Sequence, residues 1–259
     1  MRFLISFLDI INIFFPPLCP ICGNFISSGY FGVGGRGLFG WRPLLPCSDC
    51  VSLLVTPLAY VCPRCGGRRR EFDFGKSDCK RCRQLSFKFN RAVTLGEYSG
   101  ELRSIILRMK TDKFGFYART LSALLLRERG KFICGLVDVV VPVPIHRRRR
   151  WWRGVNSPDL VACEISRNLK IPVVIDAVKR IRATALQYHL SDRARAKNVA
   201  NAFEINPKKI NLLKDKRILL VDDILTTGST CNEITKLLKN AGAKDITVCA
   251  IARAIGNDR

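Results

Sequence analysis

The chain has 259 residues, of which 47% are hydrophobic, and its 44 Lys and Arg residues outnumber 21 Asp and Glu residues, which gives a formal net charge of +23 at pH 7. So many apolar side chains exclude a disordered chain and suffice for one large domain or two smaller ones. The excess of positive charge favours polyphosphate or nucleic-acid partners.

The first 18 residues combine an apolar run with polar residues at helical spacing. Polar residues from Arg2 to Asn12 share one side of a helix, apolar residues share the other side, and Pro16 and Pro17 end the pattern. We therefore expect an amphipathic helix rather than a signal peptide, because no small-residue cleavage site follows. Such a helix does not span a membrane, but it can lie on a membrane surface.

Eight of the 12 cysteines form four Cys-x2-Cys pairs in the first third of the chain. Cysteines at this spacing place two thiolates on one tight turn, and eight thiolates satisfy two closed, structural zinc sites. We expect the first two pairs to share one site and the last two pairs the other, although interleaved pairing satisfies the same count. The predicted zinc ligands are Cys19, Cys22, Cys47, Cys50, Cys62, Cys65, Cys79 and Cys82.

Two of these pairs, at Cys19 and Cys62, have the form Cys-Pro-x-Cys-Gly. The glycine allows a positive φ, which turns backbone amides towards sulfur. Zinc ligation ranks above disulfides for the paired cysteines, so they favour a reducing, cytoplasmic compartment. The other four cysteines lie in apolar or helical stretches, and we expect them in the core. They are Cys134, Cys163, Cys231 and Cys249.

Apolar strands alternate with amphipathic helices after Cys82. Such alternation predicts βαβ units and a parallel sheet covered by helices on both faces. The expected strands are residues 91–98, 138–144, 171–175, 217–221 and 245–253, and the expected helices include residues 102–109, 118–127 and 157–169. A further helix follows residue 230 and is stopped by Gly242.

The stretch RILLVDDILTTGST, residues 217–230, places two carboxylates and a threonine-rich loop between an apolar strand and a helix. We expect the strand to end at Val221, and Thr230 to cap the helix together with Glu233. The loop amides and the positive helix N-terminus suit a phosphate monoester. The carboxylates of Asp222 and Asp223 suit a vicinal diol instead, because each can accept hydrogen bonds from ribose hydroxyls.

The segment LLVDDILTTGST resembles the 5-phosphoribosyl-1-pyrophosphate (PRPP) binding motif of the type I phosphoribosyltransferases. The resemblance implies a catalytic role for Asp222 and Asp223. It implies that PRPP is bound by Asp222, Asp223, Ile224, Leu225, Thr226, Thr227, Gly228, Ser229 and Thr230. A plain strand-to-helix turn is one alternative, and a Walker-B-like magnesium site is another, which the lack of a Walker A lysine loop disfavours.

Two further segments extend the resemblance. Residues 141–157, VPVPIHRRRRWWRGVNS, are similar to a motif of the ComF family, the competence-associated phosphoribosyltransferase-like proteins, and residues 180–203 resemble that family's flexible loop. The resemblance implies an α/β fold. In it, an amphipathic helix and a double zinc-ribbon module, residues 1–87, precede a parallel-sheet type I phosphoribosyltransferase (Rossmann-like) domain, residues 88–259. The chain departs from the family at Val155, Asn156 and Ser157, where the family has Phe-Asn-Gln.

The family's chemistry implies roles for other motif residues. A nucleophile displaces pyrophosphate from the ribose, Mg²⁺ neutralises the leaving group, and a closing loop excludes water. The residues expected near the pyrophosphate and in the flexible loop are His146, Arg147, Arg148, Arg182, Thr184 and Gln187. No motif indicates which acceptor the reaction would use.

A basic segment with two tryptophans is a candidate nucleic-acid site, because arginines beside aromatic rings suit single-stranded DNA. Its residues are Arg147, Arg148, Arg149, Arg150, Trp151, Trp152 and Arg153. A solvated basic surface explains these residues equally well.

Three hypotheses follow for the function. The first is an enzyme of nucleotide metabolism that transfers phosphoribose to an unknown acceptor. The second is a cytoplasmic DNA-uptake protein that binds PRPP and single-stranded DNA. The third is a zinc-stabilised scaffold that docks on competence-machinery proteins at the inner membrane face. The intact pair of Asp222 and Asp223 favours the first two, because a scaffold has no physical need for it.

Overall fold

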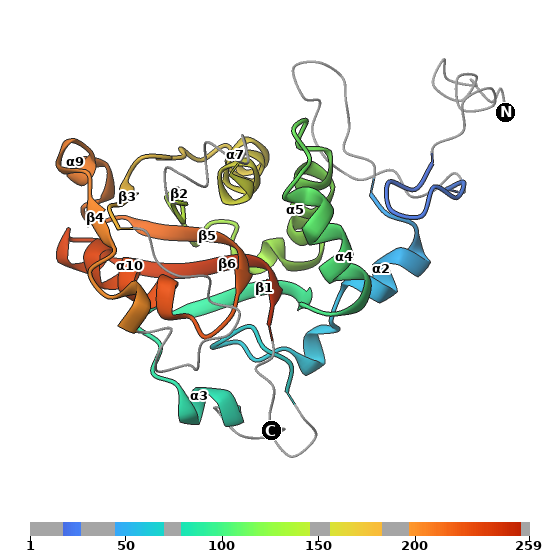
Figure 1. Ribbon diagram of the computed structural model, residues 1–259, viewed down its shortest axis with the longest axis horizontal. Helices are drawn as coiled ribbons and strands as arrows, with labels where there is room; N and C mark the ends of the chain where they lie inside the picture. The colour runs from blue at the N-terminus through green and yellow to red at the C-terminus, as the bar shows by residue number, and fades with distance from the viewer. Residues whose placement is uncertain (1–17, 27–44, 70–78, 146–155, 183–196, 255–259) are drawn as a thin grey trace, which may run out of the picture.

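The centre of the molecule is a parallel sheet of four strands in the order β1-β6-β5-β2 (Figure 1). The computed structural model describes residues 18–26, 45–69, 79–145, 156–182 and 197–254. The strands are β1 (Arg91–Glu97), β2 (Val139–Pro142), β5 (Arg217–Leu225) and β6 (Asp245–Arg253). Their runs of Val, Ile and Leu are buried on both faces, as is usual in parallel sheets. The predicted parallel sheet is therefore confirmed.

Three helices cover one face of the sheet. They are α4 (Gly100–Met109), α5 (Phe116–Arg129) and α7 (Ser157–Leu169), and α2 (Ser48–Leu54) packs at their edge. In α4 the apolar residues recur at helical spacing, so that Leu102, Ile105 and Met109 are buried together. The predicted helices 102–109, 118–127 and 157–169 are confirmed, because each lies within one of these elements.

The opposite face is covered by a helix and by a cysteine-rich segment. Helix α10 (Ser229–Asn240) buries Ile234 and Leu238 against it, and Cys62 and Cys65 belong to the same core. The remaining elements are α3 (Lys80–Gln84), β3 (Val178–Arg180), β4 (Phe203–Ile205), α9 (Ile210–Leu213) and 3-10 turns at Leu58–Tyr60, Gly130–Phe132 and Pro207–Lys209. These short elements were not predicted, because so few residues carry little periodicity.

Two predicted strands differ from the structure. Residues 171–175 form no strand but a single bridge between Val173 and β2, because Pro172 has no N–H with which to extend the ladder. The strand expected to end at Val221 continues to Leu225, since its hydrogen bonds to β6 continue to that residue. This extension changes the position of the acidic pair relative to the sheet.

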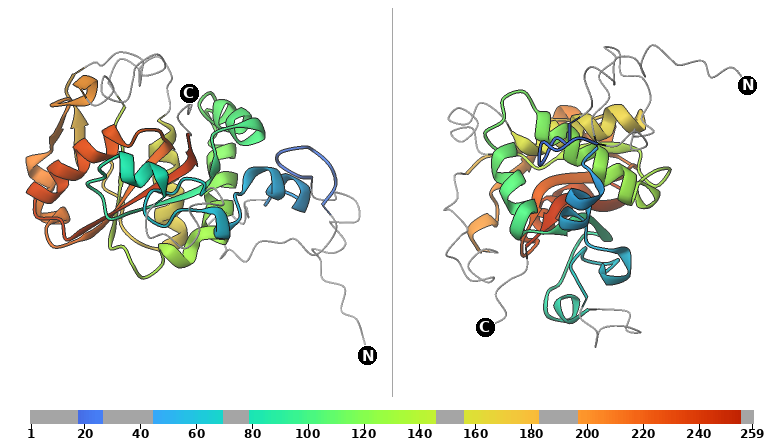
Figure 2. Two further views of the ribbon diagram at one scale, coloured as in Figure 1. Left: turned by 90° about the horizontal axis from the view of Figure 1, so that it is seen from below. Right: turned by 90° about the vertical axis from the view of Figure 1, so that its right-hand side faces the viewer.

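Helix α2 attaches the first part of the chain to the sheet. Leu54 is buried against β1, and its carbonyl oxygen comes so close to Gly96 that no side chain would fit there. The buried guanidinium of Arg129 in α5 donates to the carbonyls of Thr56 and Leu95, which joins the end of α2 to β1. Residues 18–26 lie beyond α2, at the end of the molecule (Figure 2).

No helix in the described part of the chain is long and apolar enough to cross a membrane. The amphipathic helix predicted from Arg2 to Asn12 lies outside the described residues. It therefore stays a prediction.

Candidate functional site

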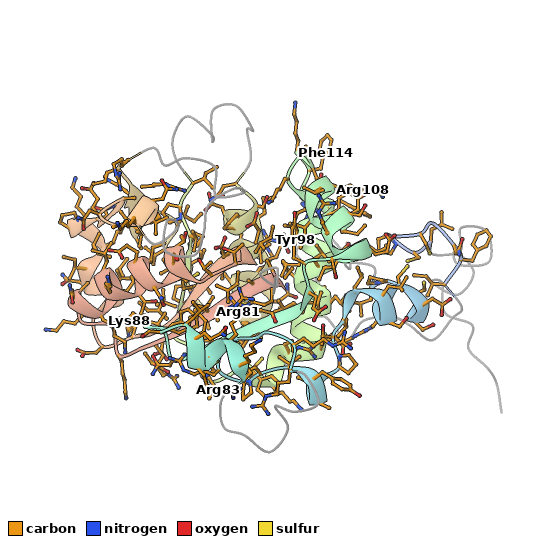
Figure 3. All side chains as sticks on the ribbon, turned by 60° about the horizontal axis from the view of Figure 1, so that its bottom comes forward. Arg81, Arg83, Lys88, Tyr98, Arg108 and Phe114 are labelled. Atoms are coloured by element: carbon orange, nitrogen blue, oxygen red, sulfur yellow. The ribbon has the colours of Figure 1, made fainter. Side chains whose placement is uncertain are left out.

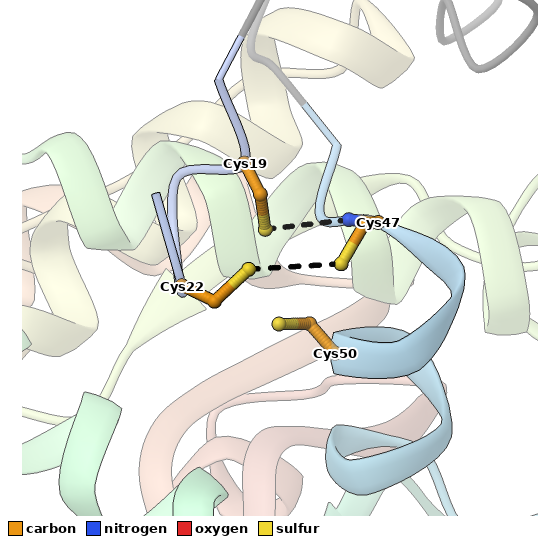
Figure 4. Close-up of side chains that lie close together, drawn as sticks. All are labelled: Cys19, Cys22, Cys47 and Cys50. Atoms are coloured by element: carbon orange, nitrogen blue, oxygen red, sulfur yellow. Dashed lines mark hydrogen bonds between the residues drawn. The ribbon is translucent and has the colours of Figure 1, made fainter. Parts of the chain in front are cut away.

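Four cysteines near the N-terminus form a first cluster, Cys19, Cys22, Cys47 and Cys50. Their sulfurs lie within 4.8 Å of one another, and Figure 4 shows them facing a common centre. Cys19 and Cys22 lie on a turn in which the Gly23 amide donates to the Cys19 carbonyl at 2.9 Å, and the φ of Gly23 is 77°. Cys47 and Cys50 lie at the start of α2.

A second cluster, Cys62, Cys65, Cys79 and Cys82, has the same construction. The Gly66 amide donates to the Cys62 carbonyl at 2.9 Å with a φ of 68°, and Cys79 is the N-cap of α3. The predicted positive φ after both Cys-Pro-x-Cys turns is confirmed. The pairing is sequential, so the interleaved alternative is excluded.

The spacing of the sulfurs fits tetrahedral zinc. Zn–S bonds of about 2.3 Å imply sulfurs about 3.8 Å apart. One Sγ–Sγ distance in the first cluster is 3.8 Å, and three in the second are 3.6 to 3.8 Å. Hydrogen bonds from neighbouring thiols, that of Cys65 first, hold the pKa of Cys62 far below its ordinary value. None of the 12 cysteines forms a disulfide. Each cluster could therefore hold one zinc ion, with no ligand position open for catalysis.

Two adjacent carboxylates lie near the carboxyl end of β5. Asp222 and Asp223 still belong to the strand, so the prediction that they lie beyond its tip is wrong. Successive side chains of a strand point to opposite faces. Accordingly, Asp223 Oδ2 lies 3.2 Å from Nζ of Lys110, just after α4, whereas Asp222 Oδ2 lies 4.0 Å from Sγ of Cys231 in α10.

The two carboxylates have different electrostatic surroundings. Burial raises the pKa of Asp222 well above its ordinary value, the charge of Asp223 raises it further, and Lys110 lowers it. The backbone N–H of Asp223 also donates to Asp222 Oδ1 at 2.9 Å. Asp223 has a lysine as counter-charge, whereas Asp222 holds its proton to a higher pH than an ordinary carboxyl does.

The loop after β5 turns sharply into α10. Gly228 precedes the helix with a φ of 83°, and a Cβ on it would lie 2.9 Å from Cε1 of Phe87, so both the backbone and the available space require glycine. The hydroxyls of Thr227 and Ser229 lie 2.8 Å apart across this turn. The turn therefore brings hydroxyl groups and helix amides together at the end of β5.

The N-terminus of α10 has no side-chain cap. The predicted capping box of Thr230 and Glu233 is wrong, because the helix already begins at Ser229, and Glu233 instead pairs with Lys236 at 3.2 Å. The N-cap residue is Gly228, which has no side chain to accept from the first-turn amides, and only the Ser229 amide donates to a nearby side chain, Oγ1 of Thr227 at 3.3 Å. Such amides, together with the helix dipole, form an anion-binding site.

Arg182 is the one described member of the predicted pyrophosphate and flexible-loop set. Its guanidinium donates to the carbonyls of Asn198 at 3.3 Å and Ala200 at 2.6 Å, which ties together the described ends of that loop. The residues of this set that lie outside the described part of the chain are His146, Arg147, Arg148, Thr184 and Gln187. The basic segment from Arg147 to Arg153, including both tryptophans, lies outside it too.

The four unpaired cysteines do not all lie in the core. Cys231 and Cys249 are buried as predicted, and burial raises the pKa of Cys249 to about 12. Cys163 is partly buried in α7. Cys134 is exposed, so its core prediction is wrong: it lies in the surface turn that follows α5.

Three residues at the site were not predicted. Lys110 pairs with an acid of β5, Arg81 donates to the Thr226 carbonyl at 3.4 Å, and Asn232 donates to the Ser86 carbonyl at 2.8 Å. No motif marks Arg81 or Asn232, because their partners are distant in the sequence. One feature of the sequence could have pointed to Lys110: it is the charged residue that directly follows the apolar stripe of α4.

Residues 160–257 match the family described as phosphoribosyl transferase domain, and this range contains β5, the acidic pair and the loop. The chain is 36% identical to Competence protein F of Haemophilus influenzae over 196 residues, which cover 74% of this chain and 85% of that protein. It is 33% identical to DNA utilization protein YhgH of Escherichia coli K12 over 244 residues, 93% and 98% of the two chains. It is 30% identical to Competence protein ComFC of Streptococcus pneumoniae over 209 residues, 80% and 87% of the two chains.

Proposed function

This chain belongs to the ComF family of competence-associated, phosphoribosyltransferase-like proteins, and we propose that it binds PRPP at the carboxyl end of β5. In this proposal residues Thr226–Thr230 and the first turn of α10 hold the 5′-phosphate, and Asp222 and Asp223 accept hydrogen bonds from the ribose hydroxyls. One observation carries it: the N-terminus of α10, whose N-cap is a glycine, follows two carboxylates on the preceding strand by only a few residues.

The electrostatics of the acidic pair support this assignment. A fully ionised pair would repel the phosphates of the ligand. Because burial and the neighbouring Asp223 raise the pKa of Asp222, this carboxyl can stay protonated at a pH at which an ordinary carboxyl is charged. Lys110 compensates the charge of Asp223. The pair can therefore offer hydrogen bonds to a diol while it carries less than two negative charges.

Mg²⁺ would enter this site together with the ligand. Magnesium prefers oxygen ligands and is usually held by one or two carboxylates plus substrate phosphates. The two carboxylates of β5 fit that role. Among the described residues, the groups of three or more potential metal ligands are the two cysteine clusters, so at β5 the protein would supply two ligands and the phosphates of PRPP would supply others. When bound, Mg²⁺ would neutralise the pyrophosphate leaving group, and the chain would position the ribose and exclude water.

Calorimetric titration of the zinc-replete protein with Mg-PRPP tests the proposal. We expect saturable binding by the wild-type chain and a loss of about tenfold or more in Asp222→Asn/Asp223→Asn, because the second substitution removes a charged acceptor, and a hydrogen bond to a charged group contributes about 1.5–3 kcal/mol. Asp215→Asn is the matched control, since it removes an exposed carboxylate just before β5. Absence of binding by the wild-type chain, or an equal loss in the control, would contradict the proposal.

We propose single-stranded DNA as a second ligand, handled in the cytoplasm during DNA uptake. Phe114 supports this: it is 86% exposed in the loop between α4 and α5, next to Lys113. The same loop begins at Lys110, which pairs with Asp223, so the exposed ring belongs to the segment that borders the acidic pair. Figure 3 shows Phe114 near Arg108 at this end of the molecule. Exposed aromatic rings beside cations stack unpaired bases.

Fluorescence anisotropy with a labelled oligothymidine tests this second role. We expect salt-dependent binding that Phe114→Ala weakens about tenfold or more, because base stacking on an aromatic ring contributes about 1–3 kcal/mol. Phe25→Ala is the control, since Phe25 is 72% exposed beside the first cluster. Trp151→Ala/Trp152→Ala tests the predicted basic segment in the same assay. Wild-type affinity in both Phe114→Ala and the tryptophan variant would exclude this mode of binding.

Release of pyrophosphate from Mg-PRPP distinguishes the remaining alternatives. Release with a nucleotide-pathway acceptor would favour the enzyme, and release with single-stranded DNA would join the two proposed ligands in one reaction. No release and no PRPP binding would favour a zinc-stabilised scaffold for competence-machinery proteins. The division into residues 1–87 and 88–259 remains part of the proposal, although the second cluster shares a core with the sheet.

A further inference from the structure

Arg253, the last residue of β6, has the largest fully buried side chain in the described part of the chain. It is 1% exposed, and none of its three guanidinium nitrogens has a hydrogen-bond partner among the described residues. Its cation lies over the ring of Phe87, with 5.5 Å between Cζ and the ring centroid. Burial of a cation is costly unless an anion lies beside it. A negative charge beside this guanidinium would offset the cost of its burial.

The second cysteine cluster lies next to this guanidinium. A Cβ placed on Gly67 would lie 3.5 Å from Sγ of Cys65 and 3.8 Å from Nε of Arg253, so one residue without a side chain separates sulfur from nitrogen. Burial first, and the charge of nearby Arg81 second, lower the pKa of Arg253 to about 10, although Cys65, Cys231 and Cys82 act in the opposite direction.

Arg81 adds a second positive charge at the same place. It lies between the ligand positions Cys79 and Cys82, it is partly buried, and its Nε also has no hydrogen-bond partner among the described residues. Two guanidinium groups this close repel each other. Four thiolates around one Zn²⁺ carry a net charge of −2, which two arginines balance.

We propose that Arg253 is the charge partner of the zinc–thiolate centre in the second cluster, and that Arg81 links this centre to the loop 226–228. Both are positioning residues: the first holds the metal centre against the end of β6, and the second holds the loop against the metal centre. The functional importance of the link through Arg81 rests on the proposed function, because it assumes that the loop binds PRPP. The pairing of Arg253 with the zinc centre does not depend on PRPP binding.

Direct hydrogen bonds run from the second cluster to the loop. Arg81 donates from Nη1 to the Ala254 carbonyl at 3.0 Å and from Nη2 to the Thr226 carbonyl at 3.4 Å. Asn232 in the first turns of α10 bonds to residues 86 and 88, at 2.8 Å in each case, and these residues lie between the cluster and β1. Figure 3 shows Arg81 nearer the centre of the molecule than Arg83, which is exposed on the same short helix.

The zinc affinity of each cluster tests the role of Arg253. The zinc-loaded full-length chain is equilibrated with increasing concentrations of a competing chelator, and iodoacetamide alkylation followed by peptide mass spectrometry reports which cysteines have lost metal. We expect Arg253→Met to weaken zinc binding at the second cluster by about 10- to 100-fold, as is typical when a residue supporting metal ligands is lost. Arg253→Lys keeps the positive charge, and we expect it to stay within a few-fold of the wild type.

Arg129→Met is the control for general destabilisation, because Arg129 is equally buried but lies in the opposite layer. It should lower the stability without selective loss of zinc from the second cluster. Protection of the first cluster should not change in Arg253→Met or Arg253→Lys. Wild-type zinc affinity in Arg253→Met, or an equal loss in Arg253→Lys and Arg253→Met, would overturn the charge-partner role.

Hydrogen exchange of the loop amides tests the link through Arg81 without any ligand. With zinc in excess, so that both clusters stay loaded, we expect Arg81→Met to accelerate exchange at residues 226–230 by about tenfold, while Arg83→Met leaves this exchange unchanged. Titration with Mg-PRPP should then show weaker binding by Arg81→Met alone. Unchanged exchange in Arg81→Met would overturn the link, whereas absence of PRPP binding in the wild-type chain would overturn the proposed function and leave the exchange result intact.

Discussion

The two cysteine clusters are built alike but lie at different depths. In each, a Cys-Pro-x-Cys-Gly turn faces the start of a short helix, α2 or α3. In the first cluster Cys22 is exposed, and residues 18–26 lie at the end of the molecule (Figure 2). In the second cluster Cys62 and Cys65 are 0% exposed and share one core with the sheet and α10.

This difference shows that two motifs of the same form can occupy very different positions in the fold. The second cluster is followed by residues 86–89, which lead directly into β1 and pack Phe87 under Gly228. The first cluster includes the start of α2, which packs on the edge of the opposite layer. Loss of metal should therefore weaken a peripheral module in one case and the core in the other.

Removal of one ligand from each cluster should give the largest contrast. We expect Cys79→Ser to lower the free energy of unfolding by about 4 kcal/mol or more, because it disrupts a buried metal site inside the core. Cys22→Ser affects an exposed ligand, and we expect about 2 kcal/mol or less. Urea unfolding followed by circular dichroism, with zinc content measured in parallel, checks both. Equal losses would show that the two clusters do not differ in role.

Alanine at the glycine that follows each Cys-Pro-x-Cys turn should separate the two clusters further. Gly23 and Gly66 both have positive φ, so alanine costs about 1 kcal/mol at either position. A Cβ on Gly66 would also lie 2.7 Å from Cγ2 of Thr94 on β1, whereas a Cβ on Gly23 would meet nothing within 4 Å. Overpacking should add about 1–3 kcal/mol to Gly66→Ala alone. Thermal unfolding of the two variants measures this difference, and indistinguishable melting temperatures would refute it.

Asn232→Ala should loosen the attachment of the second cluster to α10. It removes the two hydrogen bonds to residues 86 and 88, and we expect a loss of about 1–2 kcal/mol in the free energy of unfolding. Asn168→Ala is the matched control, because Asn168 is exposed and donates only to a carbonyl of its own helix, that of Glu164. An equal loss in the control would mean that the attachment contributes little.

The smallest expected effect is a pH dependence of stability that comes from Asp222, whose side chain lies on the same side of the sheet as the second cluster. The folded chain binds the Asp222 proton more tightly than the unfolded chain does, because burial raises its pKa above 3.8. Stability from this group is therefore fully present below about pH 4 and is lost as the pH rises towards the folded pKa. In Asp222→Asn this decline should disappear. Melting temperatures of wild type and variant should converge near pH 4 and diverge towards pH 7, in favour of the variant, and a constant difference would contradict the assignment.

Much of the fold was predictable because it depends on local periodicity. Apolar residues occur at the spacing that strands and helices require, and this spacing predicted β1, β2, β5, β6 and α4. The length of β5 was not predictable, because Asp222 and Asp223 are poor strand formers that are held in the ladder by β6. The false capping box at Thr230 had the same origin, since the tertiary turn at Gly228 decided where α10 begins.

The sequence by itself determined the parallel sheet, the two four-cysteine sets and the acidic pair followed by a threonine-rich loop, because each depends on residues that are close together in the chain. Only the tertiary structure decided that Lys110 pairs with Asp223 and that Arg253 is buried beside the second cluster. These contacts join residues far apart in the sequence, and they form only when the layers pack. Charge and burial, which determine what the site can do, therefore follow from packing rather than from local pattern.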